Sequence, residues 1–195
     1  MSKRLFDLVI ATTALALLAL PMLAIAAWIR FDSPGPVFFR QPRVGRHGRL
    51  FDIHKFRTMR HAAPGLALTV GDDARITRAG RWLRRTRLDE LPQLIDVLAG
   101  HMSLVGPRPE VPRYAQTVPE PLRSRWLAVR PGITDPVSLE HLDESALLAR
   151  AADPEREYVQ VILPRKVQAA VAYAERASLA TDLGVLWRTA RTLWT

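Results

Sequence analysis

The densest group of chemically active side chains lies at residues 84–92, which read RRTRLDELP. Three arginines precede two neighbouring carboxylates, Asp89 and Glu90. Ionised carboxylates can act as nucleophiles, as bases or as magnesium ligands. If Asp89 caps a helix, the positive helix end and Arg84 or Arg87 favour its ionised form. By itself an Asp-Glu pair at a helix start is more often a structural cap, and adjacent carboxylates do not match the facing pair of a glycosidase.

Two further cations are candidate phosphate ligands. Lys55 and Arg57 flank Phe56 in HKFRTM, so the three side chains alternate sides if this stretch is a strand. Arg108 lies between two prolines, and a stiff loop there would hold its two-pronged guanidinium in place. The alternative interpretation is that Lys55 and Arg108 are solvated surface side chains. The five histidines show no spacing typical of a metal site.

Composition limits the classes of function. The 195 residues suit one catalytic domain with appendages, and 48% apolar residues can form a sizeable core. The absence of cysteine excludes disulfides, thiolate zinc sites and cysteine nucleophiles. A net charge of +9, carried almost entirely by arginine, indicates an anionic partner. Nucleic acid, an acidic membrane surface and a phosphorylated substrate all satisfy this requirement.

The amino-terminal segment is long and apolar. Residues 8–29 carry no charge, and their number is close to the roughly 20 needed to cross a bilayer as a helix. A cleaved secretory signal, a straight span and a re-entrant helix are all compatible with this pattern. Basic residues lie on both sides of the segment, which pulls both flanks toward the cytoplasm. Pro21 lies near the middle, where it can bend the helix.

The elements around the candidate residues follow from local pattern. Residues 37–39 and 50–56 read as short strands joined through a turn at 43–48, which predicts a β-hairpin. Apolar residues at helical spacing predict a helix from about Asp89 to a stop at Gly100.

The carboxyl-terminal third reads as helical. Residues 154–177 predict a helix that is interrupted or kinked near Pro164. Residues 178–194 predict an amphipathic helix that either lies on a membrane surface or packs on the core. Its apolar face is expected to contain Leu179, Leu183, Leu186, Trp187, Ala190 and Trp194.

Several long motifs occur together in one order. They are KRLFDL near the start, SPGPVFFRQPRVGRHGRLFDIHKFRTM, RITRAGRWLRRTRLDELPQLIDVLAGHMSLVGPRPE, and PGIT at residues 131–134. With these motifs the chain resembles the bacterial sugar transferases, also called monotopic phosphoglycosyl transferases. The resemblance is dense over residues 3–134 and thin afterwards.

This resemblance implies an α+β, mainly helical fold. A re-entrant membrane helix is expected at residues 1–31, followed by a cytoplasmic catalytic domain at 32–195 that contains the small hairpin and amphipathic surface helices. The enzyme would lie on the bacterial inner (cytoplasmic) membrane, with the catalytic domain facing the cytoplasm.

The resemblance also implies a two-step reaction. Asp89 would attack the sugar-linked phosphate of a UDP-sugar and release UMP, and polyprenyl (undecaprenyl) phosphate would then accept the phospho-sugar. This is the first membrane step of bacterial glycoconjugate synthesis, such as exopolysaccharide production. Glu90 would accept a proton or help hold Mg2+, which would bind near Asp89 and neutralise the diphosphate. Lys55, Arg84 and Arg108 would line the site.

The chain also departs from the family pattern. Leu20 precedes Pro21 where relatives usually have serine, which leaves open whether the helix is re-entrant or spanning. After PGIT the sequence diverges, so sugar recognition cannot be transferred. Nucleic acid is not an expected partner, and the oligomeric state is left open. A non-catalytic basic membrane module and a transferase of the bare sugar, which would release UDP, are the competing hypotheses.

Overall fold

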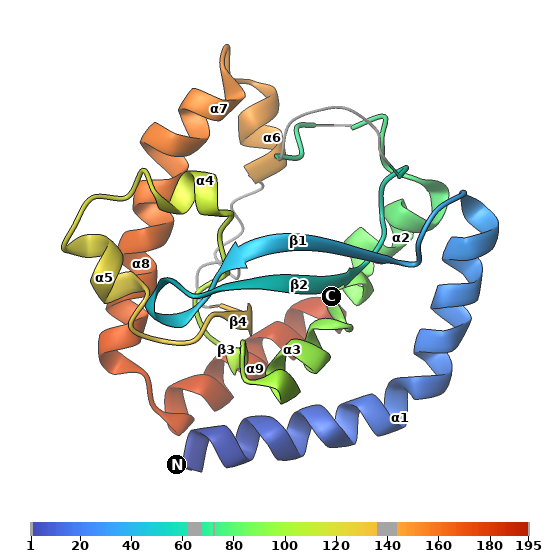
Figure 1. The fold of residues 1–195 in the computed structure, drawn as a ribbon, viewed down its shortest axis with the longest axis horizontal. Helices are drawn as coiled ribbons and strands as arrows, with labels where there is room; N and C mark the ends of the chain where they lie inside the picture. Colours follow the sequence, from blue (N-terminus) through green and yellow to red (C-terminus); the bar gives the residue numbers. More distant parts are fainter. Residues whose placement is uncertain (1, 62–67, 72, 136–143, 195) are drawn as a thin grey trace.

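The computed structural model describes residues 2–61, 68–71, 73–135 and 144–194. It confirms a mainly helical fold with little sheet (Figure 1). In chain order the elements are α1 (Ser2–Asp32), β1 (Phe38–Val44), the 3₁₀ turn η1 (Arg46–Gly48), β2 (Leu50–Phe56), α2 (Arg78–Thr86), the 3₁₀ turn η2 (Leu88–Glu90), α3 (Gln93–Ala99), β3 (Ser103–Val105), α4 (Pro112–Ala115), α5 (Leu122–Trp126), β4 (Gly132–Thr134), α6 (Glu144–Ala149), α7 (Pro154–Glu157), the π turn η3 (Tyr158–Ile162), α8 (Leu163–Arg176) and α9 (Leu179–Trp194).

The long helix α1 dominates one side of the molecule. It contains Pro21, which lacks the amide proton needed for the helical hydrogen bond, and the helix bends within its length (Figure 1). In the part of the chain that the structure describes, it is the one helix long and apolar enough to cross a membrane. Large apolar side chains such as Leu17 and Leu20 are 75% and 78% exposed. The helix therefore presents an uncovered apolar surface.

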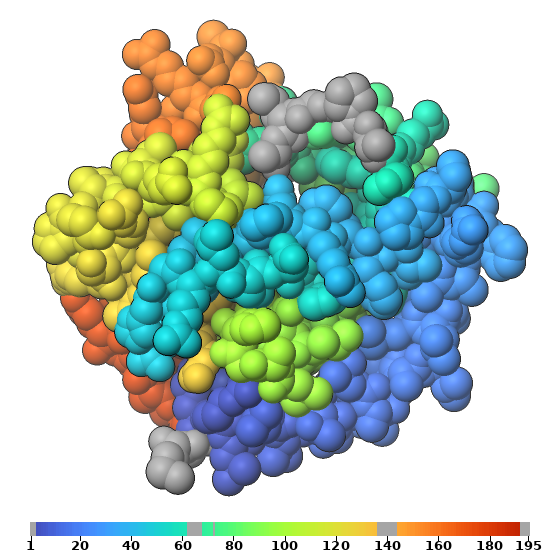
Figure 2. Space-filling model, in the orientation of Figure 1, coloured from blue at the N-terminus to red at the C-terminus, as the bar shows by residue number. Residues whose placement is uncertain are grey.

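The predicted hairpin is confirmed and lies across the middle of one face, with α1 along two borders of that face (Figure 2). Strands β1 and β2 pair antiparallel from Phe38 opposite Phe56 to Val44 opposite Leu50. Strand β1 is longer than the predicted residues 37–39, because Pro42 can lie within an edge strand, where no further ladder needs its amide.

Buried apolar side chains of the described residues form three clusters between these elements. One lies under the hairpin, α3 and β3, one joins the carboxyl-terminal helices, and one joins α1 to α2 and Phe56. The parallel strands β3 and β4 run through the first cluster. The elements β2, η2 and β3, which carry or precede candidate site residues, therefore each pack against buried apolar side chains.

Of two helix predictions, one needs correction and the other is confirmed. The predicted helix from Asp89 to Gly100 is a 3₁₀ turn followed by α3, although Gly100 does end it in a left-handed conformation. The kink predicted near Pro164 is confirmed as the π turn η3 just before it.

The predicted apolar face of residues 178–194 is only partly covered by the domain. Among the side chains of α9 that the structure describes, which exclude Trp194, Asp182 and Val185 are buried, whereas Leu183 and Trp187 are 53% and 73% exposed. The helix docks through the polar contacts of Asp182, which turns part of the apolar face outward.

Candidate functional site

Strand β2 delivers Lys55 to the site. Phe51, Ile53 and Lys55 share one face because side chains alternate along a strand. Phe51 and Ile53 bury in the core, so Lys55 at the end of this row is also largely enclosed. Burial lowers the pKa of the Lys55 ammonium, and the neighbouring Glu90 carboxylate offsets part of that effect. Lys55 is thus a cation held inside the domain.

The two carboxylates lie on a tight turn rather than on a helix. Arg87 ends α2 with φ of 59° and ψ of 11°, a left-handed conformation that few residues other than glycine adopt. The turn η2 follows at once and buries both Asp89 and Glu90. Helix α3 starts only at Gln93, without a side-chain cap, so Asp89 is not the helix cap that was considered from sequence.

The position of Arg108 depends on a close approach between two backbone segments. Strand β3 runs into Gly106, where a Cβ would lie 2.4 Å from the Arg130 carbonyl oxygen. On the facing strand, a Cβ on Gly132 would lie 2.1 Å from the Gly106 nitrogen. Both positions therefore require glycine. The Pro107-Arg108-Pro109 loop leaves this junction and points Arg108 toward Glu90.

Glu90 joins the two predicted phosphate-binding cations. Its Oε1 accepts a hydrogen bond from Lys55 Nζ at 2.8 Å and another from Arg108 Nη2 at 2.6 Å. Arg108 Nη1 also lies 3.4 Å from Oε2. Burial alone would raise the pKa of Glu90, but Arg108 and Lys55 outweigh it and hold that pKa well below its usual range. Glu90 is therefore a charged bridge between the cations.

Asp89 has a different environment from its neighbour. No hydrogen bond to its carboxylate occurs among the described residues, yet Lys55, Arg108 and Arg84 all act to lower its pKa. Burial outweighs them and leaves the pKa of Asp89 above its ordinary value. Arg84 therefore acts in the direction expected from sequence, but burial has the larger effect on the pKa of Asp89.

Arg84 lies in the last turn of α2 and is half-buried. Its Nη2 donates to the Thr69 hydroxyl at 2.8 Å, which holds the guanidinium on the Asp89 side of the site. The structure thus brings together all five residues predicted from sequence: Lys55, Arg84, Asp89, Glu90 and Arg108. Arg57, by contrast, binds carbonyl groups at the end of α1 and takes no part in the cluster.

Sequence reasoning missed two buried carboxylates near this cluster, Asp96 and Glu110. Asp96 in α3 is buried and accepts from the backbone nitrogen of His54 at 2.9 Å, while its other oxygen lies 2.7 Å from His54 Nδ1. This contact locks β2 to α3 beside Lys55. Glu110, two residues after Arg108 in the GPRPE motif, borders a small pocket with Arg108 and Lys166. The position of Glu110 directly after the proline-flanked loop is the sequence feature that could have identified it.

The residues present fit a magnesium ion. Within the described residues no cluster of three or more His, Asp or Glu side chains could enclose a metal. Mg2+ usually binds through only one or two carboxylates, with substrate phosphates and water completing the octahedron. Both Glu90 oxygens already face cations, whereas Asp89 is without a hydrogen bond from described residues. Asp89 is therefore the carboxylate suited to such an ion.

A carboxylate among three cations is an arrangement typical of sites that bind anionic phosphates, and an exposed apolar helix is typical of proteins that lie on a membrane. Comparison with known proteins gives the family. A family model for bacterial sugar transferases matches residues 1–195, and the chain belongs to this family. It is a transferase.

Individual relatives agree with this assignment. The chain is 46% identical over 142 residues to an exopolysaccharide production protein of Rhizobium leguminosarum bv. phaseoli, covering 68% of this chain and 70% of that one. It is 39% identical over 199 residues to a UDP-glucose:undecaprenyl-phosphate glucose-1-phosphate transferase of Caulobacter vibrioides, covering 99% and 70%. It is 36% identical over 199 residues to a UDP-N-acetylgalactosamine-undecaprenyl-phosphate N-acetylgalactosaminephosphotransferase of Aeromonas hydrophila, covering 99% and 44%.

The length of chain that is shared differs among relatives. The chain spans between 38% and 70% of the first four curated relatives that it matches. Two of the relatives described above are named for different sugars, glucose and N-acetylgalactosamine. Similarity therefore supports the general reaction and leaves the sugar open.

Proposed function

We propose that this enzyme transfers a sugar-1-phosphate from a UDP-sugar to polyprenyl phosphate and releases UMP, through a covalent phospho-sugar on Asp89. The observation that carries the proposal is the contrast between the two carboxylates. Glu90 is bound by Lys55 and Arg108, whereas Asp89 lies among the same cations without a hydrogen bond from the described residues. Of the two, Asp89 has the freedom that a nucleophile needs.

In the first step an Asp89 oxygen attacks the phosphorus that carries the sugar. A phosphorus–oxygen bond forms to Asp89, and the bond to the bridging oxygen breaks, so that UMP leaves with the electron pair. Lys55, Arg84 and Arg108 counter the repulsion between the carboxylate and the anionic diphosphate. Mg2+, held by Asp89, would supply further neutralisation of the phosphates.

In the second step an oxygen of polyprenyl phosphate attacks the same phosphorus. The bond to Asp89 breaks, which frees the carboxylate and yields a polyprenyl diphosphate sugar. Glu90 keeps Lys55 and Arg108 pointed at the reacting phosphates. The role of Glu90 as proton acceptor stays a prediction, because its two oxygens face cations and its pKa is held low.

The test uses the full chain in detergent with a panel of UDP-sugars but no lipid acceptor. The covalent route predicts a burst of one UMP per enzyme and a protein mass increase equal to one phospho-sugar. Asp89→Asn abolishes both, whereas Asp52→Asn, at an exposed position of β2, leaves both unchanged. An undiminished burst from Asp89→Asn would remove this residue from the mechanism, and release of UDP would indicate transfer of the bare sugar.

We further propose that α1 enters the membrane and returns to the side that it left. Both of its ends bind the catalytic domain. Near the start, Arg4 Nη1 donates to the Val97 carbonyl of α3 at 2.7 Å. Near the end, Asp32 accepts from the Ala79 nitrogen of α2 at 3.1 Å. A straight span would carry one of these ends about 30 Å away, across the hydrocarbon. The arrangement supports a cytoplasmic domain lying on the inner membrane.

A further inference from the structure

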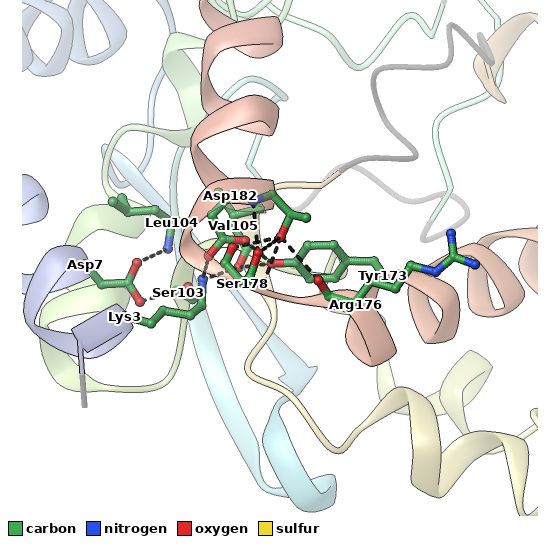
Figure 3. Close-up of polar contacts among 10 residues, drawn as sticks. Lys3, Asp7, Ser103, Leu104, Val105, Tyr173, Arg176, Ser178 and Asp182 are labelled. Atoms are coloured by element: carbon green, nitrogen blue, oxygen red, sulfur yellow. Dashed lines mark hydrogen bonds and ion pairs between the residues drawn. The ribbon is translucent and has the colours of Figure 1, made fainter.

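The first turns of α1 are bonded to the strand that precedes Arg108. Asp7 accepts a hydrogen bond from the Ser103 hydroxyl at 2.9 Å and one from the Leu104 nitrogen at 3.3 Å. Lys3 Nζ donates to the Val105 carbonyl at 3.2 Å. In Figure 3 both side chains point from α1 toward β3. All three residues of the strand are thus contacted by polar groups of the membrane helix.

A second helix completes this network. Asp182 of α9 forms an ion pair with Lys3 and accepts a hydrogen bond from the Tyr173 hydroxyl (Figure 3). The same hydroxyl lies 3.3 Å from the Val105 carbonyl oxygen. Asp182 is 1% exposed and Asp7 is 2% exposed, so little water competes for these contacts. Charge-assisted bonds in such surroundings are strong and sensitive to the loss of one partner.

The network is connected to the candidate site through the backbone that follows β3. Only Gly106 and Pro107 separate Val105 from Arg108, and the glycine is fixed against the opposite backbone. A displacement of β3 therefore moves the Arg108 guanidinium, because the proline-flanked loop has little freedom to absorb it. Errors of about 1 Å in placing a catalytic group can lower a rate by roughly a hundredfold.

We propose that Lys3, Asp7 and Asp182 are positioning residues, which set the place of Arg108 from the membrane end of the molecule. The proposal rests on the proposed function, in which Arg108 binds the substrate phosphates. It assigns to α1 a role besides anchoring: its first turns hold the strand that leads to the phosphate-binding loop. None of the three side chains touches substrate.

A purely structural role would affect stability alone, and a double variant separates the two possibilities. Lys3→Met by itself leaves the Asp182 carboxylate buried without its cation, which lowers the unfolding temperature. Adding Asp182→Asn removes that charge and restores stability, yet residue 3 still lacks a donor for the Val105 carbonyl. Lys3→Arg keeps both donors and charge, and serves as the conservative variant.

The measurements are UMP release with a UDP-sugar and polyprenyl phosphate, thermal unfolding, and amide hydrogen exchange of residues 103–108. For Lys3→Met/Asp182→Asn we expect near wild-type unfolding, roughly tenfold lower kcat with KM changed less than twofold, and roughly tenfold faster exchange. Lys3→Arg regains kcat. Glu175→Gln, which breaks a surface pair with Arg125, changes none of the three quantities.

Wild-type kcat and exchange in the double variant would overturn the proposal. If the wild-type enzyme released no UMP from any UDP-sugar, the proposed function would fail by itself. Hydrogen exchange would still decide whether Lys3 and Asp182 restrain residues 103–108, because that measurement needs no turnover.

Discussion

Glu90 and its neighbour Asp89 are both carboxylates, but their environments suit them to different roles. The Glu90 carboxylate takes the hydrogen bonds of Lys55 and Arg108, so the cations are oriented before any phosphate arrives. In the proposed reaction a substrate phosphate meets donors that need little rearrangement, which is the usual origin of electrostatic catalysis. Asp89, the residue directly before Glu90, is left without such a partner among the described residues.

Replacing Glu90 tests this division. Glu90→Gln keeps the size but removes the charge that Lys55 and Arg108 share. Since breaking a buried ion pair leaves its partners uncompensated, we expect a loss of about 3 kcal/mol in the free energy of unfolding. We also expect kcat to fall by roughly a hundredfold as the cations lose their orientation. Thermal unfolding and UMP release measure the two effects.

The matched control for this substitution is Glu175→Gln. Glu175 pairs with Arg125 on the surface, where the two side chains are 55% and 56% exposed. Surface pairs contribute about 0–1 kcal/mol, so stability and kcat should hardly change. Equal unfolding temperatures for the two variants would contradict the bridging role of Glu90.

At the scale of elements, α2 is pressed against the end of the hairpin. A Cβ on Gly80 would lie 1.9 Å from the Thr58 carbonyl oxygen, so no larger residue fits without moving one of the two segments. Arg84 lies one helical turn further along α2 and depends on this fit for its place beside Asp89.

Two glycine substitutions in helices are therefore expected to have opposite effects. Gly80→Ala should lower the free energy of unfolding by about 2 kcal/mol through overpacking, and reduce kcat through Arg84. Gly184→Ala, in α9, meets nothing within 4 Å and should raise stability by about 0.5–1 kcal/mol through helix propensity. Thermal unfolding compares the pair, and a stable Gly80→Ala enzyme would show that α2 can shift freely.

Local patterns predicted some elements well and others poorly. The hairpin follows from alternation and turn residues, and the ordered motifs identified Lys55, Glu90 and Arg108 before their contacts were known. The side of α9 that packs on the domain could not be predicted, because it depends on the contact of Asp182 with Lys3, 179 positions earlier. Likewise, no spacing rule pairs His54 with Asp96 across 42 positions. Polar contacts between residues far apart in the chain produce no periodic sequence pattern from which they could be predicted.

At the scale of the whole molecule, the topology of α1 can be tested because the chain contains no cysteine. Single cysteines replace Leu5 and Leu20, which are 65% and 78% exposed, and Asp52 in the hairpin. In spheroplasts a re-entrant helix predicts that a membrane-impermeant maleimide labels none of them. After permeabilisation it should label the cysteines at positions 5 and 52, while position 20 reacts only in detergent.

A straight span gives a different pattern in the same experiment. With the catalytic domain and position 52 on the cytoplasmic side, it places position 5 outside, so the cysteine at position 5 would react in intact spheroplasts. The cysteine at position 52 also controls for leaky preparations, because its label must stay low before permeabilisation. Labelling of position 5 alone would reject the re-entrant arrangement.

The pairing of Lys3 with Asp182 has a consequence for biosynthesis. Lys3 leaves the ribosome well before α9 does, and Lys3 meets Asp182 of α9 across 179 positions. Until then the amino-terminal helix can settle into lipid while β3 still lacks part of its support. Under the proposed membrane topology and positioning role, the nascent chain reaches the membrane before the loop that carries Arg108 is fixed, and full activity requires the docking of α9.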